Sequence, residues 1–102
     1  MAKYEAVFSP QADADLAKIK KFYARQIVTR IETVLLHRAE DVTRSSVKKL
    51  RGFESLYRLR VGDYRVFYRV RSNQVTVLRI LSKDEEAEFY REAKDYEGDP
   101  NI

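Results

Sequence analysis

The 102-residue sequence has no cysteine and no tryptophan, and it contains only one histidine, two prolines and three glycines. Without cysteine the chain can form neither a disulfide framework nor a thiolate metal site. One histidine and scattered carboxylates lack the spacing of metal ligands, and three isolated glycines do not make a phosphate-binding loop. We therefore expect neither a bound metal nor a cofactor.

Long hydrophobic runs are also missing. No segment approaches the roughly 20 apolar residues of a membrane span, and the first ten residues lack the apolar core of a secretory signal. The hydrophobic fraction of 44% is ordinary for a soluble globular protein. We expect one domain over residues 1–102, with a frayed tail at about 95–102, in the cytoplasm and away from membranes.

Charge is unevenly distributed along the chain. Residues 44–71 hold nine basic and two acidic residues, whereas residues 84–99 hold eight acidic and two basic ones. The basic segment is typical of a surface that binds a polyanion. The acidic segment is either a solubilising surface or a screen for the basic segment in the free protein.

The basic segment contains the most regular pattern in the chain. Residues 56–70, LYRLRVGDYRVFYRV, form two runs in which apolar and basic residues alternate. A period of two predicts strands with two different faces, and Gly62-Asp63 between them predicts a hairpin turn. One face of this hairpin carries apolar residues, and the other carries Arg58, Arg60, Arg65, Phe67 and Arg69.

The first half of the chain is predicted to form a strand followed by two helices. Residues 4–8 alternate as a short strand, and Ser9-Pro10 is typical of a helix start, with serine as N-cap. Apolar residues at helical spacing predict one helix as far as Phe22. A break is expected at 23–26, before a second helix whose apolar face is Ile27, Ile31, Val34 and Leu35.

The second half completes an α+β fold. Residues 71–74 predict a second turn, with Asn73 in the left-handed conformation, and residues 75–81 are apolar on both faces, as in an interior strand. Residues 84–94 fit a helix with Ala87, Tyr90 and Arg91 on one face. We expect an N-terminal strand, a two-helix hairpin on one face of a small, mostly antiparallel sheet with a three-strand C-terminal meander, and a short C-terminal helix. The sheet face that carries the arginines should be open.

Several of these motifs resemble the RelE/ParE superfamily of toxins from bacterial and archaeal toxin–antitoxin systems. They are Lys49-Leu50-Arg51-Gly52, the specific string YRLRVGDYRVFY at 57–68, the strand at 75–81 and Tyr90 in the last helix. The resemblance covers nearly the whole chain. It implies a toxin whose partner is a RelB-like antitoxin that wraps it with a helix or strand. RelE-like members cut mRNA on the ribosome, and ParE-like members act on DNA gyrase.

The RelE-like branch is favoured, and it implies a set of site residues on the basic sheet face and the last helix. Arg65 would stabilise the phosphate, Arg58 and Arg60 would position RNA, Lys83 would be the basic assistant, and Tyr90 would stack or transfer a proton. The resemblance and the charge pattern place RNA-binding residues around them, at Lys48, Lys49, Arg51, Arg69 and Phe67.

Two departures from the family pattern keep a second hypothesis open. The family often has lysine where this chain has Arg58 and Arg60, and guanidinium groups are poor general bases. Asp84 occupies a position that is often basic, so Lys83, or Lys49 if it reaches the site, is the remaining base candidate. The alternative is a toxin that acts by binding only, either a ParE-like gyrase inhibitor or a catalytically decayed member.

Some residues have a simpler structural interpretation. Tyr57, Tyr64 and Tyr68 are expected in the core rather than against RNA bases. His37 is the usual candidate for nuclease chemistry, but it is expected to be an ordinary helix residue far from the arginines. Tyr90 could equally pack its helix or serve the site.

Overall fold

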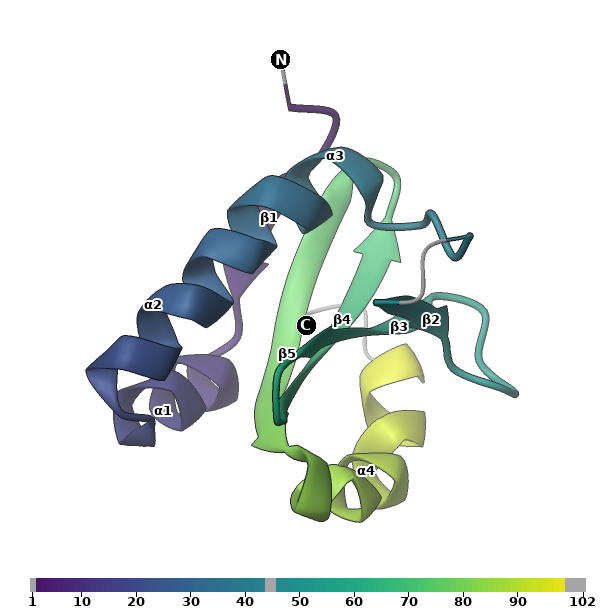
Figure 1. Cartoon of the computed structure of the whole chain (residues 1–102). Coiled ribbons are helices and arrows are strands. Elements are labelled where there is room, and N and C mark those ends of the chain that lie inside the picture. Colours follow the sequence, from purple (N-terminus) through teal and green to yellow (C-terminus); the bar gives the residue numbers. More distant parts are fainter. Residues whose placement is uncertain (1, 44–45, 99–102) are drawn as a thin grey trace.

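The computed structural model describes residues 2–43 and 46–98 (Figure 1). None of the described helices is long and apolar enough to cross a membrane. The strands are β1 (Glu5–Phe8), β2 (Val47–Lys49), β3 (Leu56–Val61), β4 (Tyr64–Arg71) and β5 (Gln74–Ser82). The helices are α1 (Pro10–Lys18), α2 (Lys21–Arg30), α3 (Leu36–Arg38) and α4 (Glu86–Gly98), with a π-helical turn at Ile31–Leu35 and a 3₁₀ turn at Lys83–Glu85.

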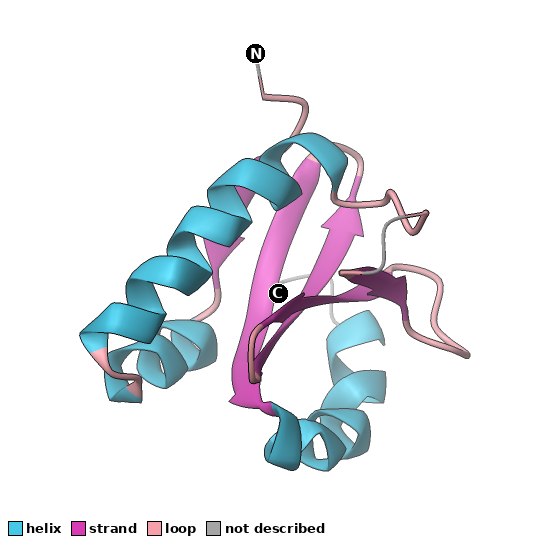
Figure 2. Ribbon diagram, in the orientation of Figure 1, coloured by secondary structure: helices cyan, strands magenta, loops and turns pink. Residues whose placement is uncertain are grey.

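The five strands form one sheet in the order β1-β5-β4-β3-β2. β1 pairs with β5 in parallel, and the other neighbours are antiparallel. The predicted α+β class is confirmed, with β2 as an additional short strand. The strand that is apolar on both faces, β5, lies inside the sheet as expected. Figure 2 shows helices on both sides of the strands.

The start of α1 follows the sequence prediction. The Ser9 hydroxyl accepts a hydrogen bond from the Ala12 amide at 3.1 Å and donates one to the Leu78 carbonyl at 2.9 Å. The same N-cap therefore begins the helix and attaches it to β5. The predicted break at 23–26 is wrong, because Ile19 and Lys20 take extended conformations and α2 begins at Lys21. Phe22 therefore belongs to α2, where it is exposed.

The predicted face of the second helix is confirmed. Ile27, Ile31, Val34 and Leu35 are all buried. They form one core with side chains from the same face of the sheet, among them Tyr57, Leu59, Val61, Val66 and Tyr68. Tyr57 and Tyr68 stack with ring centroids 5.6 Å apart, so these tyrosines are core residues as expected.

The sheet face expected to be open is covered by α4. Phe89 stacks on Phe67 of β4 at 4.2 Å and on Tyr96 at 5.5 Å, and Ala93 is buried beside them. The predicted helix face of Ala87, Tyr90 and Arg91 is wrong, because all three are exposed. Phe89, Ala93 and Tyr96 also recur at helical spacing, and they bury more apolar area against the strand residues Phe67, Leu78 and Leu81.

Both turns lie where the sequence placed them, and the second differs only in which residue has a positive φ. Gly62 has a φ of +57°, the left-handed conformation that glycine adopts without strain. In the turn between β4 and β5 the residue with positive φ is Ser72, at 53°, instead of Asn73. The first turn fixes the register in which Arg60 pairs directly with Arg65.

An ion network holds α4 to the rest of the fold. The Arg79 guanidinium on β5 binds Asp15 of α1 at 2.8 Å and Glu92 of α4 at 2.7 Å. Asp15 also accepts the Ile80 amide at 2.9 Å, and Tyr96 donates to Glu92 at 3.0 Å. The hydrogen bond to Asp15 is the main cause of the raised pKa of Arg79. Arg79 and Asp15 are mostly shielded from solvent, and Glu92, whose side chain is 38% exposed, joins α4 to them.

The raised pKa values of two tyrosines in the core under α2 predict how the free energy of unfolding changes at alkaline pH. Burial, with a hydrogen bond to Glu40, raises the pKa of Tyr4 to about 12, and burial also raises the pKa of Tyr68. Because both folded values exceed the unfolded value of 10.0, this stabilisation is complete below pH 10 and is lost as the pH rises through the folded values. The free energy of unfolding should therefore fall above pH 10. Urea unfolding at stepped pH measures this, and Tyr4→Phe should make the decline shallower; an equal decline would contradict the assignment.

Candidate functional site

Two of the predicted site arginines meet at one carboxylate. Arg58 of β3 and Arg65 of β4 both reach Glu86, the first residue of α4. Arg65 Nε lies 2.8 Å from Glu86 Oε1, and Arg58 Nη1 lies 3.3 Å and 3.4 Å from the two Glu86 oxygens. All three side chains are mostly buried but reach solvent. We refer to these three residues as the arginine cluster.

The arginine cluster keeps unused hydrogen-bond donors. Arg58 Nε is buried and has no partner among the described residues. Arg65 Nε is close enough to Glu86 for an ion pair, but its N–H is not directed at a described acceptor. Arg65 Nη1 donates to the Gly62 and Tyr64 carbonyls at 2.9 and 3.0 Å, which holds the guanidinium at the hairpin turn. Fixed guanidinium groups with spare donors are suited to bind an oxyanion.

The other predicted basic residues surround the arginine cluster without joining it. Lys48 of the exposed edge strand β2 pairs with Arg58, so its side chain leaves the sheet on the same side. Lys49 and Arg51 are exposed nearby on the chain. Arg60 is exposed and lies opposite Arg65, but it borders a separate groove between α2 and β3.

Two residues predicted to bind RNA are buried under α4. Phe67 has no exposed surface, because Phe89 stacks on it. The Arg69 guanidinium donates a hydrogen bond to the Tyr96 carbonyl in the last turns of α4, at 3.1 Å. A cation at this place satisfies a helix C-terminus. With α4 in place, neither side chain can contact RNA, and both serve to hold this helix.

Lys83 precedes α4, in the 3₁₀ turn Lys83–Glu85, and Tyr90 lies within α4. Lys83 is exposed, its amide donates to the Asp63 carbonyl at 2.8 Å, and its Nζ lies 3.7 Å from an Asp63 oxygen. Tyr90 is 42% exposed and meets Phe67 and Phe89 edge-on at 6.1 and 6.3 Å. Tyr90 therefore packs in part against Phe67 and Phe89 and in part faces solvent, and its role in the site stays a prediction.

Glu86 was missed by the sequence interpretation. The residues of α4 that face the sheet, Phe89, Ala93 and Tyr96, continue backwards at helical spacing to Glu86. If the buried face of the helix had been assigned from its largest apolar residues, the Glu86 carboxylate would have been placed against the basic strands. The helix start is fixed by Ser82 and Glu85, whose side chains form a capping box.

No group of histidine, cysteine, aspartate and glutamate suited to hold a metal occurs among residues 2–43 and 46–98. His37 is exposed on α3 and has no part in the arginine cluster. The predicted site residues and Glu86 carry guanidinium, ammonium, phenol and carboxylate groups.

Comparison with known families decides the identity. The family model of the ParE toxin of the type II toxin–antitoxin system parDE matches residues 6–87. The chain belongs to this family. It is thus a toxin of a type II toxin–antitoxin system with the RelE/ParE fold, and the predicted superfamily is confirmed. A comparison with curated proteins gives no match.

Solved structures extend the likeness of this toxin to the RelE side of the superfamily. The free Escherichia coli toxin RelE, as a mutant, is 24% identical, with a TM-score of 0.74 over 94% of this chain and 98% of that one. The RelE–RelB complex of Pyrococcus horikoshii is 26% identical, with a TM-score of 0.66 over 79% and 96%. The RelB–RelE complex of Methanococcus jannaschii is 22% identical, with a TM-score of 0.67 over 81% and 96%.

Proposed function

We propose that this toxin is an endoribonuclease that cuts mRNA in the ribosomal A site and thereby arrests translation in the cytoplasm. The observation that carries this proposal is the arginine cluster, in which Arg58 and Arg65 converge on one carboxylate and keep spare donors. A site already organised around one anion is suited to a scissile phosphate. We also propose a RelB-like antitoxin as its protein partner, which is supported by the RelB complexes of similar toxins.

The chemistry that fits these residues uses the RNA's own 2′-hydroxyl as nucleophile. The 2′-oxygen attacks the adjacent phosphorus, and the bond from phosphorus to the 5′-oxygen breaks. The products are a 2′,3′-cyclic phosphate and a 5′-hydroxyl end. Arg65, fixed at the turn by its two backbone hydrogen bonds, would hold the phosphate oxygens as negative charge builds on them. The contacts of Arg58 to Glu86 are long for charge-assisted bonds, so Arg58 can turn to the same phosphate.

Glu86 is a better candidate for the general base than Lys83 or Lys49, the candidates from the sequence. An ionised carboxylate accepts a proton, which a guanidinium group in a protein does not. Glu86 lies against both phosphate-binding side chains, where it would take the proton of the 2′-hydroxyl. The departing 5′-oxygen needs a proton in return, and Tyr90 and Lys83 are two candidate donors among the described residues.

A second candidate function, inhibition of DNA gyrase by binding, is favoured by the residues that follow the last strand. Lys83 is followed by the acidic Asp84, Glu85 and Glu86, where the RelE-like branch often has basic residues. The matching family model is that of a ParE toxin. If the Glu86 carboxylate only neutralises Arg58 and Arg65, the protein would act by binding and would not cut RNA.

The two candidate functions differ in their target, which is the translating ribosome in one and DNA gyrase in the other, so two parallel assays distinguish them. Purified toxin is added to a cell-free translation reaction and, in parallel, to a DNA supercoiling reaction with gyrase. We expect arrest of translation and normal supercoiling. Inhibited supercoiling with normal translation, from protein shown to be folded by circular dichroism, would contradict the ribonuclease and support the gyrase function.

A further inference from the structure

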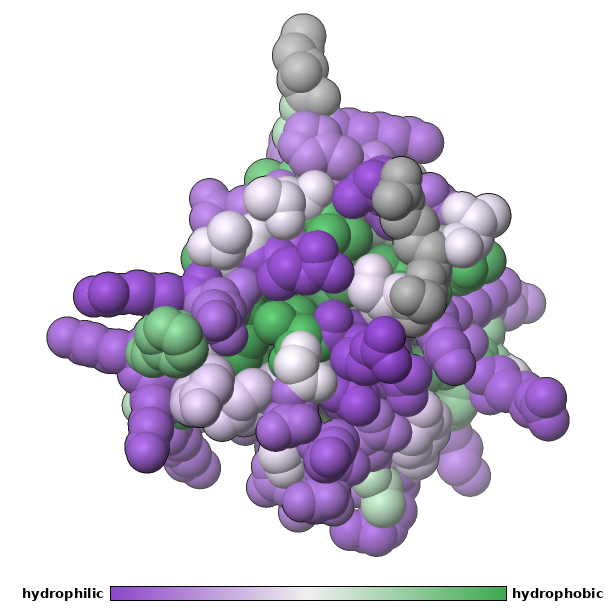
Figure 3. Space-filling view, viewed as in Figure 1, coloured by the Kyte–Doolittle hydropathy of each residue, from purple (hydrophilic) through white to green (hydrophobic). Residues whose placement is uncertain are grey.

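A second basic surface lies outside the arginine cluster. A groove of about 1210 Å³ runs between α2–α3 and the edge of the sheet at β3. Figure 3 shows a hollow in the middle of this face, with a small apolar area at its bottom and hydrophilic residues around it. Four arginines are among the residues that line this groove, which we name the arginine groove: Arg25, Arg30, Arg38 and Arg60.

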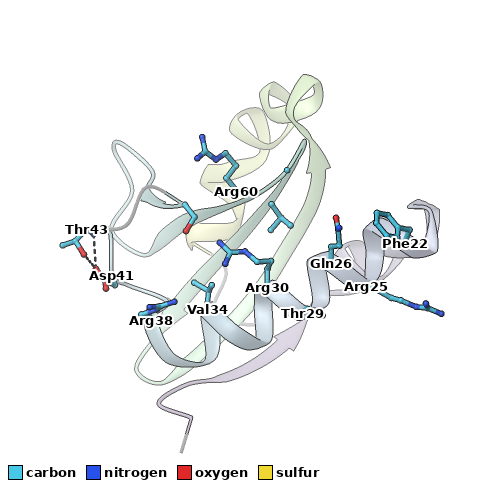
Figure 4. A pocket seen from close by; sticks show the side chains of 13 residues that line it. Phe22, Arg25, Gln26, Thr29, Arg30, Val34, Arg38, Asp41, Thr43 and Arg60 are labelled. Atoms are coloured by element: carbon cyan, nitrogen blue, oxygen red, sulfur yellow. Dashed lines mark hydrogen bonds between the residues drawn. The ribbon is translucent and has the colours of Figure 1, made fainter.

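The charges of the arginine groove are not neutralised within the described part of the chain. The structure gives none of the four guanidinium groups an ion pair or a side-chain hydrogen bond with a described residue. Asp41 is the only acidic residue of the described lining, and it already binds the Thr43 amide and hydroxyl. In Figure 4, Arg30 extends from α2 towards the strands, and Arg60 extends from β3 on the other side. Arg25 points away from the strands in the same view (Figure 4). Uncompensated cations along one open groove favour an anionic partner.

Arg60 connects this groove with the arginine cluster. It is the direct cross-strand partner of Arg65, and it leaves the sheet on the same side as Arg58. It also lines the groove. A chain of phosphates that has one member at Arg58 and Arg65 could therefore continue past Arg60 to Arg30 and Arg38.

The composition of the arginine groove favours a nucleic acid over a protein helix. An amphipathic helix needs an apolar surface for its anchor residues. The apolar floor of this groove consists of Val34 and Val61, which are only 3% and 8% exposed because the core already covers them. The large exposed apolar side chain of the lining is Phe22, 66% exposed at the end of the groove, where a base can stack on it.

From these observations we infer that the arginine groove binds the phosphate backbone of the RNA strand that enters the arginine cluster. This inference rests on the proposed ribonuclease function and adds a second contact region for the same substrate. The groove would raise the affinity for RNA and set its path, and it takes no part in bond cleavage. Arg30 and Arg38 bind phosphates, Arg60 guides the strand between the two regions, and Phe22 supports a base.

The test measures RNA binding separately from cleavage. The probe is a fluorescent single-stranded RNA of about twelve nucleotides with 2′-O-methyl sugars, which lacks the attacking hydroxyl. Its dissociation constant is measured by anisotropy over a series of salt concentrations for the wild type and for Arg30→Gln/Arg38→Gln. Arg91→Gln/Lys94→Gln is the matched control, because it removes two exposed cations from α4. Thermal unfolding checks that all three proteins are folded.

We expect the groove variant to bind about ten-fold more weakly at low salt. The slope of its log affinity against log salt should fall by about 1.4, since each lost phosphate contact on a single strand contributes about 0.7. The control should keep the wild-type slope. In cleavage assays on ribosomes the groove variant should raise KM and leave kcat near the wild-type value.

Three results would overturn the inference. One is an unchanged slope and affinity in the groove variant, and another is an equal change in the control. The third is binding of poly-glutamate that is as tight as RNA binding and is lost in the groove variant, which would mark the groove as a site for an acidic protein segment. Failure of the proposed function is distinguishable, because wild type that binds the probe through the groove but cuts no mRNA would contradict the ribonuclease alone.

Discussion

Arg65→Ala should lower the rate of mRNA cleavage by about 100- to 1000-fold, the usual effect of removing one donor to a developing oxyanion. Arg65 lies at the centre of the arginine cluster, held by the Gly62 and Tyr64 carbonyls and directed at the same place as Arg58. Alanine leaves the phosphate without its fixed guanidinium. Single-turnover cleavage on programmed ribosomes measures the change.

Three controls separate an effect on catalysis from an effect on folding in this variant. Arg65→Ala also removes two hydrogen bonds at the hairpin turn, each worth about 1 kcal/mol, so thermal unfolding must show that the protein is still folded. Arg65→Lys keeps the charge without the planar fork and should lose less activity. Arg91→Ala removes an exposed arginine of α4 and should be neutral. Full activity of folded Arg65→Ala would rule out its role.

Glu86→Gln should abolish cleavage while leaving RNA affinity unchanged or higher. The amide has nearly the shape of the carboxylate but cannot accept the 2′-proton, and loss of a general base costs about 100- to 10,000-fold. The substitution also removes the negative charge that pairs with both arginines, which should favour binding of phosphate. Single-turnover cleavage and anisotropy with the methylated RNA give the two quantities.

The opposite result for Glu86 would assign it a different role. If Glu86→Gln cleaves faster than the wild type, the carboxylate only occupies the phosphate site and α4 restrains the toxin. If neither protein cuts, Glu86 is part of a binding-only site. Glu88→Gln, an exposed carboxylate two residues along the same helix, should match the wild type in both assays.

Local patterns predicted most of the fold correctly. Alternation in residues 56–70 gave both strands of the hairpin, their turn at Gly62 and their core-facing side chains, because strand geometry is set by neighbouring residues. The start of α1 at Ser9 was also predicted correctly, because an N-cap depends on neighbouring residues. The boundary between α1 and α2 was predicted wrongly, because neither glycine nor proline marks it and the apolar spacing continues past Ile19 to Phe22.

The candidate site was harder to predict, because it depends on which face of α4 meets the sheet. The sequence placed Arg58 and Arg65 on one face of the sheet but left that face open to solvent. Tertiary packing of Phe89 on Phe67 covers that face, buries Arg69 and places Glu86 between the arginines. The spacing of Phe89, Ala93 and Tyr96 marks the apolar face of α4, but no local pattern shows which strand residues that face contacts. The arginine groove has the same origin, since α2, α3 and β3 contribute to it from separate segments.

Primer extension on mRNA from a cell-free translation reaction tests the central claim most directly. The wild-type toxin should produce discrete cuts at codons within the reading frame, only on messages engaged by ribosomes, and Arg65→Ala should produce almost none. Absence of any cut with protein that is folded and free of antitoxin would contradict the ribonuclease. The arginine cluster would then be a binding site, and gyrase would be the first target to examine.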